Sequence, residues 1–301
     1  MNRTVILIKR NLRLFIRDKA AVFFSFLSTI ILVALYFLFI AKIYTNGMDN
    51  AENIGIGIPL TEAAKNFIVY SQMIAGVLIL NSISMATGAF STIAKDFENK
   101  RIDSLMLTPV KTHEIILAYF MTGFIASIVA NAFTFLLSYV IIGISTGYWL
   151  SITTCLMVLV VLVAASLISC AIMLLVTTLI KSSTAIGVIN GVLGTFLGFL
   201  CGIYMPYNNL GEASKAVGSF LPFSHLTVWL KQVMLDDAFV QIGISGEFKD
   251  LLYGDKYFSA SSIGFCGLDV PLWTMLIISG VVGFLLLGIS YFLLHKRIKR
   301  K

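Results

Sequence analysis

Six long apolar stretches constrain what this chain can fold into. A helix needs about 20 consecutive apolar residues to cross the hydrocarbon core of a bilayer. Each stretch reaches that length, and none contains Asp, Glu, Lys or Arg. We therefore expect a polytopic membrane protein with six transmembrane helices. The predicted spans are residues 20–41, 67–93, 115–143, 151–180, 184–204 and 271–294.

The composition favours an all-α membrane fold. Of the 301 residues, 58% are hydrophobic and only 12% are charged, whereas an ordinary soluble domain has about 25% charged residues. This much apolar surface excludes a disordered chain, a coiled coil and almost any soluble enzyme. We expect residues 1–301 to form a single transmembrane domain.

The basic residues outside the predicted spans indicate an orientation. Sixteen of the 22 Lys and Arg residues lie in the N-terminal segment, the loop after the second span, the turn after the fourth span and the C-terminal tail. Cytoplasmic loops of membrane proteins carry such an excess. We therefore expect both termini in the cytoplasm and the chain in the cell membrane. The net charge of +7 then reflects orientation and lipid contact, without a nucleic-acid partner.

Residues 3–17, within an N-terminal segment 1–19, have the pattern of an amphipathic helix. At 100° per residue the arginines fall on one side and the apolar residues on the other. We expect this helix at the inner membrane interface, with its basic face toward lipid phosphates or a partner protein; a mere orientation signal is the alternative. The basic face holds Arg3, Arg10, Arg13 and Arg17, and the apolar face holds Val5, Ile8, Leu12, Phe15 and Ile16.

The loop at 94–114 differs from the other predicted cytoplasmic pieces. It mixes four basic residues with four acidic ones, which is more than a positively charged tether requires. Ile102, Leu105 and Met106 recur at helical spacing, and Thr108 and Pro109 end the pattern. A short helix with an apolar stripe suits a protein-docking surface, and the alternative is a solvated connecting loop.

The segment 205–270 is the largest piece outside the predicted spans. Pro206 and Pro222 interrupt its helical pattern, so we expect short external helices between the fifth and sixth spans. Cys201 precedes this segment and Cys266 lies near its end, and a disulfide between them is one option.

Three asparagines, Asn81, Asn131 and Asn190, are conspicuous within the predicted spans. Ser84 and Thr87 share a rough helical face with Asn81. Such residues either line a transport pathway or form hydrogen bonds between helices. The sequence leaves both interpretations open, so Asn81, Ser84, Thr87 and Asn190 are candidate pathway residues.

Five glycines recur in the fifth span at steps of three or four residues, which keeps them close to one helical face. Small residues at this spacing let two helix backbones approach closely in lipid. The face could meet a second subunit or pack within one chain. The glycines are Gly187, Gly191, Gly194, Gly198 and Gly202.

The chain lacks the motifs of an energy-converting enzyme. It has no G-x-x-x-x-G-K-[ST] sequence for binding ATP, no metal-ligand spacing and no nucleophile paired with a base. It also has no charged residue within the predicted spans, where proton-coupled carriers usually need one. We therefore expect no catalytic residue, metal or cofactor on this chain, and an external source of energy if it transports.

Together these features resemble the type-two ATP-binding-cassette permease family. The sequence DSLMLTPVKTHEI, residues 103–115, is similar to the family loop E-x-L-x-x-T-P-V that precedes the third span. The sequence GIYMPYNNLGEASKAVGSFLPFSHLT, residues 202–227, is similar to the stretch after the fifth span. Where the family often has a Glu/Gly/Thr cluster, this chain has Asn99-Lys100-Arg101-Ile102.

The resemblance implies a coupling helix that docks on a separate cassette ATPase, which holds ATP and Mg²⁺. It also implies two permeases around one route, either two copies of this chain or this chain and a homologue, meeting at the fifth span. The candidate coupling residues are Asp96, Glu98, Arg101, Asp103, Leu105, Met106, Thr108 and Pro109, and those of the dimer interface are Gly187, Gly191, Gly194 and Gly198.

Two functions follow from these observations. The first is a permease that exports a lipophilic drug, a peptide or a glycolipid-like compound with energy from the ATPase. The second is a membrane sensor or anchoring subunit that binds a partner without transporting.

Overall fold

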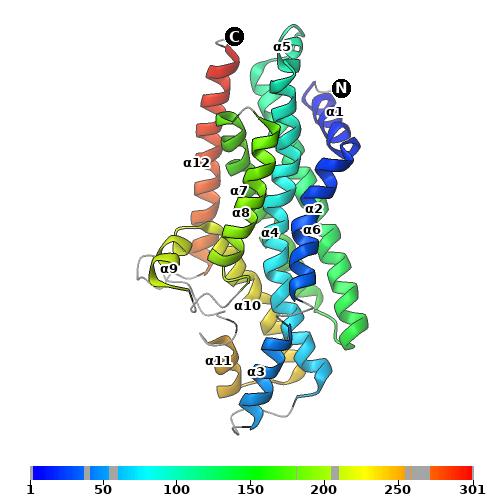
Figure 1. The fold of residues 1–301 in the computed structure, drawn as a ribbon, viewed down its shortest axis with the longest axis vertical. Coiled ribbons are helices and arrows are strands. Elements are labelled where there is room, and N and C mark those ends of the chain that lie inside the picture. The colour runs from blue at the N-terminus through cyan, green and yellow to red at the C-terminus, as the bar shows by residue number, and fades with distance from the viewer. Residues whose placement is uncertain are drawn as a thin grey trace.

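A computed structural model describes residues 3–36, 41–53, 60–180, 182–204, 210–254, 258 and 272–299. Throughout this part of the chain the regular structure is helical, without a strand (Figure 1). The helices are α1 (Arg3–Arg17), α2 (Lys19–Leu35), α3 (Ala41–Asn53), α4 (Glu62–Glu98), α5 (Arg101–Met106), α6 (Thr112–Thr146), α7 (Ile152–Leu179), α8 (Ser183–Leu200), α9 (Glu212–Ser219), α10 (Pro222–Ile242), α11 (Glu247–Tyr253) and α12 (Leu272–Lys299).

Five of these helices are long and apolar enough to cross a membrane: α4, α6, α7, α8 and α12. They coincide with the second to sixth predicted spans, so the all-α prediction is confirmed and the span count is confirmed for five of six. The first predicted span, 20–41, corresponds to α2, an apolar helix of 17 residues. Residues 37–40 of that stretch lie outside the described residues.

Helix α4 forms the centre of the bundle. It packs against α2, α6, α7, α8 and α10, and the most apolar part of its length is entirely buried. Thr61 begins the helix by accepting a hydrogen bond from the Ala64 amide. The surrounding helices keep large apolar side chains exposed, as lipid contact requires; Phe133, Val188 and Phe284 are each about 60% exposed.

The two ends of the bundle carry different elements. Helices α1 and α5 and the end of α12 lie at one end, and α3 and α11 lie at the other (Figure 1). Both chain termini are therefore at the end of the bundle that also carries α5.

The segment after α8 differs in one respect from the sequence expectation. Helices α9 and α11 are short, but α10 has 21 residues and packs against α4, α7 and α12. Pro222 does not break this helix, because it occupies the first turn, where no backbone donor is needed. Cys201 is a buried free thiol, and Cys266, its suggested partner, lies outside the described residues.

Asn81 and Asn131 join four helices through hydrogen bonds. Asn81 Nδ2 donates to Asn131 Oδ1 at 2.8 Å, and Thr29 Oγ1 donates to Asn81 Oδ1 at 3.0 Å. Asn131 Nδ2 donates to Ser82 Oγ at 2.7 Å and to Ser166 Oγ at 3.2 Å. Both asparagines are fully buried. Of the two interpretations that the sequence left open, these contacts favour bonding between helices for this pair.

Replacing Asn131 with Leu should test that interpretation. The change leaves Asn81 Nδ2 and two serine hydroxyls with fewer partners, and such bonds contribute about 0.6 kcal/mol each in membrane proteins. We expect a loss of about 1–2 kcal/mol of stability, measured as a lower thermal midpoint of the purified protein. Thr195→Ala is the control, because Thr195 is exposed and bonds to a carbonyl of its own helix. Lost transport at unchanged stability would instead favour a pathway role.

Candidate functional site

The chain reverses direction at the C-terminal end of α4 and forms α5. Lys100 adopts a left-handed backbone conformation with φ of 54°, which turns the chain out of α4. Its carbonyl then accepts a hydrogen bond from the Asp103 amide at 3.1 Å. Helix α5 ends at Met106, and Pro109, which has no amide hydrogen, follows in the turn that leads to α6.

The apolar stripe of α5 packs onto the protein itself. Ile102 is only 2% exposed, and Leu105 and Met106 pack against the same cluster of buried residues. Ile102 is therefore covered by the bundle, whereas Leu105 and Met106 are half-buried, and their contact with an ATPase stays a prediction. Thr108 and Pro109 are exposed, as the docking prediction requires.

Leu107 is the apolar residue that this segment presents outward. It is 89% exposed and lies between the end of α5 and the exposed Thr108. The sequence pattern does not single out Leu107, because it falls outside the helical spacing of its neighbours. Only its exposure in the folded chain identifies it, since large apolar side chains that stay exposed often mark contact sites.

Asp96 lies inside the protein and does not contribute to an exposed docking surface. Its side chain is 1% exposed, and its Oδ2 atom is 3.1 Å from Arg10 Nη1 and accepts a hydrogen bond from the Tyr119 hydroxyl at 3.0 Å. Arg101 Nη1 lies 3.7 Å from Oδ1. The carboxylate therefore joins α1 and α6 to the last turn of α4. It also draws Arg10, whose side chain is 31% exposed, toward the end of α4, whereas the sequence placed Arg10 on a basic face toward lipid phosphates or a partner protein.

Two neighbours of Asp96 in the last turn of α4 bind further elements. Lys95 forms an ion pair with Asp18 between α1 and α2. Glu98 accepts hydrogen bonds from the Ser183 amide and hydroxyl, both at 2.8 Å, at the start of α8. The last turn of α4 thus contacts α1, α2, α6 and α8 through side chains. We call this turn, residues 95–98, the α4 joint.

Glu98 in the α4 joint and Asp18 beside it both have a lowered pKa. The Ser183 amide, followed by the Ser183 hydroxyl, lowers the pKa of Glu98. Burial opposes the charge on Asp18, but hydrogen bonds from Lys95 and the Ala21 amide outweigh it and lower the pKa of Asp18. Asp18 Oδ1 accepts from Ala21 at 3.1 Å, so it also caps the start of α2.

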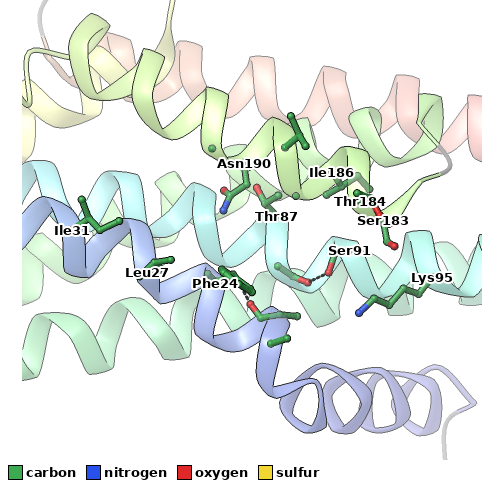
Figure 2. A pocket seen from close by; sticks show the side chains of 17 residues that line it. Phe24, Leu27, Ile31, Thr87, Ser91, Lys95, Ser183, Thr184, Ile186 and Asn190 are labelled. Atoms are coloured by element: carbon green, nitrogen blue, oxygen red, sulfur yellow. Dashed lines mark hydrogen bonds between the residues drawn. The ribbon is translucent and has the colours of Figure 1, made fainter.

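A groove of about 640 Å³ lies between α2, α4 and α8 and begins beside the α4 joint (Figure 2). Its walls are mainly apolar, with Phe24, Leu27 and Ile31 on the α2 side. Lys95 and Ser183 are among its lining residues at one end. The pairs Lys95–Asp18 and Glu98–Ser183 therefore connect the three helices that border the groove.

Only two of the four candidate pathway residues line this groove. Thr87 and Asn190 lie next to each other in it (Figure 2), and Asn190 Oδ1 has no hydrogen-bond partner among the described residues. Asn81 and Ser84 are buried elsewhere in the bundle and do not line the groove. The structure therefore places two of the four residues side by side along the groove, although Thr87 itself is only 1% exposed.

The glycines of α8 also fall into two groups. A side chain at Gly187, Gly191 or Gly194 would meet nothing within 4 Å in this chain. A Cβ at Gly198, in contrast, would come within 2.1 Å of the Tyr204 ring of the same chain. Close packing within one chain thus accounts for Gly198, whereas the other three form an open face beside the groove.

The described residues contain no group of three or more His, Cys, Asp or Glu side chains that could hold a metal ion. The features that the site does present are an exposed apolar residue beside α5, the α4 joint and a largely apolar groove.

The comparison with family models gives one match. A model described as ABC-2 type transporter matches residues 2–235, a range that runs from α1 into α10 and includes the α4 joint, α5 and the groove. A search of curated proteins finds no match. Because the family model covers well over half of the chain, this protein belongs to the ABC-2 type transporter family as a membrane-spanning permease component.

Proposed function

We propose that this chain is an exporter permease that works as one of two such subunits, driven by a separate cassette ATPase that holds ATP and Mg²⁺. The substrate is a lipophilic drug, a peptide or a glycolipid-like compound, and the chain itself catalyses no reaction. The observation that carries this proposal is the α4 joint, which links the segment bearing Leu107 to the helices that border an apolar groove. A sensor or anchoring subunit would not require that link.

ATP-dependent movement of substrate distinguishes the two functions. The permease and a cassette ATPase that copurifies with it would be reconstituted together in vesicles. Compounds that stimulate ATP hydrolysis would then be tested for transport. We expect transport that requires both ATP and the permease. Binding of the ATPase without any stimulated hydrolysis or transport would favour the sensor or anchoring subunit.

The positions of α1 and the end of α12 support six spans with both termini in the cytoplasm. An odd number of crossings would leave the two termini at opposite ends of the bundle, yet α1 and the end of α12 share one end (Figure 1). Counting α2 as the first span makes the number even. The end with α1, α5 and the tail also carries the excess of Lys and Arg, which favours its cytoplasmic location.

The groove suits a lipophilic substrate, because its walls are largely apolar and α8 leaves an open face beside it. A second permease facing α8 would close the groove into a central route lined by both subunits. Thr87 and Asn190 would then be among the few polar residues in a largely apolar wall, the combination typical of small-molecule sites.

Leu107 provides the first test of ATPase docking. Leu107→Asp would place a charge in a contact that is apolar in this proposal, where an unpaired charge is costly. We expect the affinity for the ATPase to fall by about tenfold or more, equivalent to about 1.4 kcal/mol, as measured by copurification and titration. Leu107→Met is the control and should bind normally. Normal binding of the Asp variant would place the docking surface elsewhere.

Asp96 tests the coupling role of the α4 joint. Asp96→Ala removes the acceptor for the buried Tyr119 hydroxyl and the counter-charge of Arg10, at a cost of about 1–3 kcal/mol of stability. We expect ATP hydrolysis by the complex to continue while transport falls several-fold. Asp96→Asn retains an acceptor oxygen and should lose less. Equal transport by both variants and the wild type would rule out this role.

Cysteine cross-linking tests the subunit interface on α8. In a background without the four native cysteines, Gly187→Cys and Gly191→Cys should each cross-link two subunits, because this chain leaves open space at both positions. Gly198→Cys is the control, since its side chain meets Tyr204 of the same chain and should cross-link poorly. Failure at positions 187 and 191 in a dimer that forms normally would exclude this face as the interface.

A further inference from the structure

Two sides of helix α1 contact the rest of the protein, and a third side is exposed. Leu7, Asn11 and Phe15, spaced four residues apart, are buried on the side of α1 that packs against α6 and α4. Arg10 points to Asp96. These contacts fix the rotation of α1 about its axis, so the remaining face has a defined composition.

The open face of α1 carries an apolar groove of about 460 Å³. Val5, Ile8, Leu12 and Ile16 form its apolar part. Ile16 is 68% exposed and Val5 is 49% exposed, although α1 continues almost directly into the apolar helix α2. Exposed apolar side chains in a helix at the start of a membrane segment are covered most favourably by lipid hydrocarbon.

The other residues lining this groove are Lys9, Arg13 and Arg17. None of the three forms an ion pair with the described residues, and no acidic residue lines the groove. The two nearby carboxylates are already engaged, because Asp18 pairs with Lys95 and Asp96 is buried beside Arg10. The groove therefore combines an apolar surface with three uncompensated positive charges.

We propose that the open face of α1 is a binding site for one anionic phospholipid. Lys9, Arg13 and Arg17 bind the phosphate group, and the acyl chains lie against Val5, Leu12 and Ile16. Charge complementarity favours this occupant, since an anionic lipid brings a net negative charge to the three cations and a zwitterionic lipid brings none. The proposal goes beyond the transport function and requires only that the chain lies in a membrane.

The test measures lipid binding to the purified permease without an ATPase. The Lys9→Gln/Arg13→Gln/Arg17→Gln variant is compared with the control Lys19→Gln/Lys42→Gln/Lys296→Gln, which removes the same charge from exposed positions outside the groove. Native mass spectrometry counts the phosphatidylglycerol molecules retained, with phosphatidylcholine as the neutral probe. We expect the wild type and the control to retain one tightly bound phosphatidylglycerol, and the groove variant to bind it about tenfold or more weakly.

Further variants and probes distinguish a lipid site from its alternatives. Val5→Ser/Ile16→Ser should also weaken phosphatidylglycerol binding, and both residues are exposed enough that the fold should survive. Arg13→Gln alone provides a second measurement if the triple variant does not fold. Inorganic phosphate should not displace the lipid.

Equal losses in the groove variant and the control, or displacement by phosphate, would overturn the proposal. Unchanged lipid binding with lost ATPase copurification would identify the face as a protein contact instead.

Discussion

Burial of α4 along its length is the constraint on which the rest of this structure depends. A helix surrounded by α2, α6, α7, α8 and α10 cannot expose a charged side chain to water until it leaves the bundle. Charged residues therefore appear only at its ends, and the last turn concentrates them within residues 95–98. Because several helices surround α4, those side chains meet α1, α2, α6 and α8 at one place. The α4 joint is thus a direct consequence of where the central helix ends.

Polar side chains in the interior of the bundle make different contacts from those at the end of α4. Within the buried interior, Asn81 and Asn131 satisfy each other and nearby hydroxyls without carrying charge, as the absence of water requires. At the end of α4, Asp96 remains close enough to the surface that Arg10, which is 31% exposed, can reach it. The interior contacts hold the spans together. The charged contacts instead connect the spans to α1 and α5, the elements available to a partner.

The sequence predicted the parts of the fold that depend on local pattern. Long uncharged stretches locate five of the spans, and helical spacing locates α1 and α5. The pattern could not indicate what each apolar face meets. It placed Ile102 on a docking surface and Arg10 on a face toward lipid or a partner protein, whereas Ile102 packs onto the bundle and Arg10 reaches Asp96. Leu107 was missed for the same reason, because its importance comes from exposure, and exposure depends on contacts far apart in the sequence. Likewise, Asn190 and Asn81 look alike in the sequence, and only the packing of the helices shows that Asn190 lines the groove while Asn81 bonds to a neighbouring helix.

The contacts at the α4 joint differ in strength, and this difference suggests how the groove opens. Asp96 and Tyr119 are buried, so separating them would leave polar groups unsatisfied at a cost of about 1–3 kcal/mol. The Lys95–Asp18 pair is only partly buried and the contact between Glu98 and Ser183 is exposed, and pairs open to solvent contribute only about 0–1 kcal/mol. A force applied at α5 should therefore separate α8 and α2 from α4 while α6 remains attached. Spin-label distances measured during ATP turnover should widen between α4 and α8 and stay constant between α4 and α6; widening of the α4–α6 distance would contradict this order.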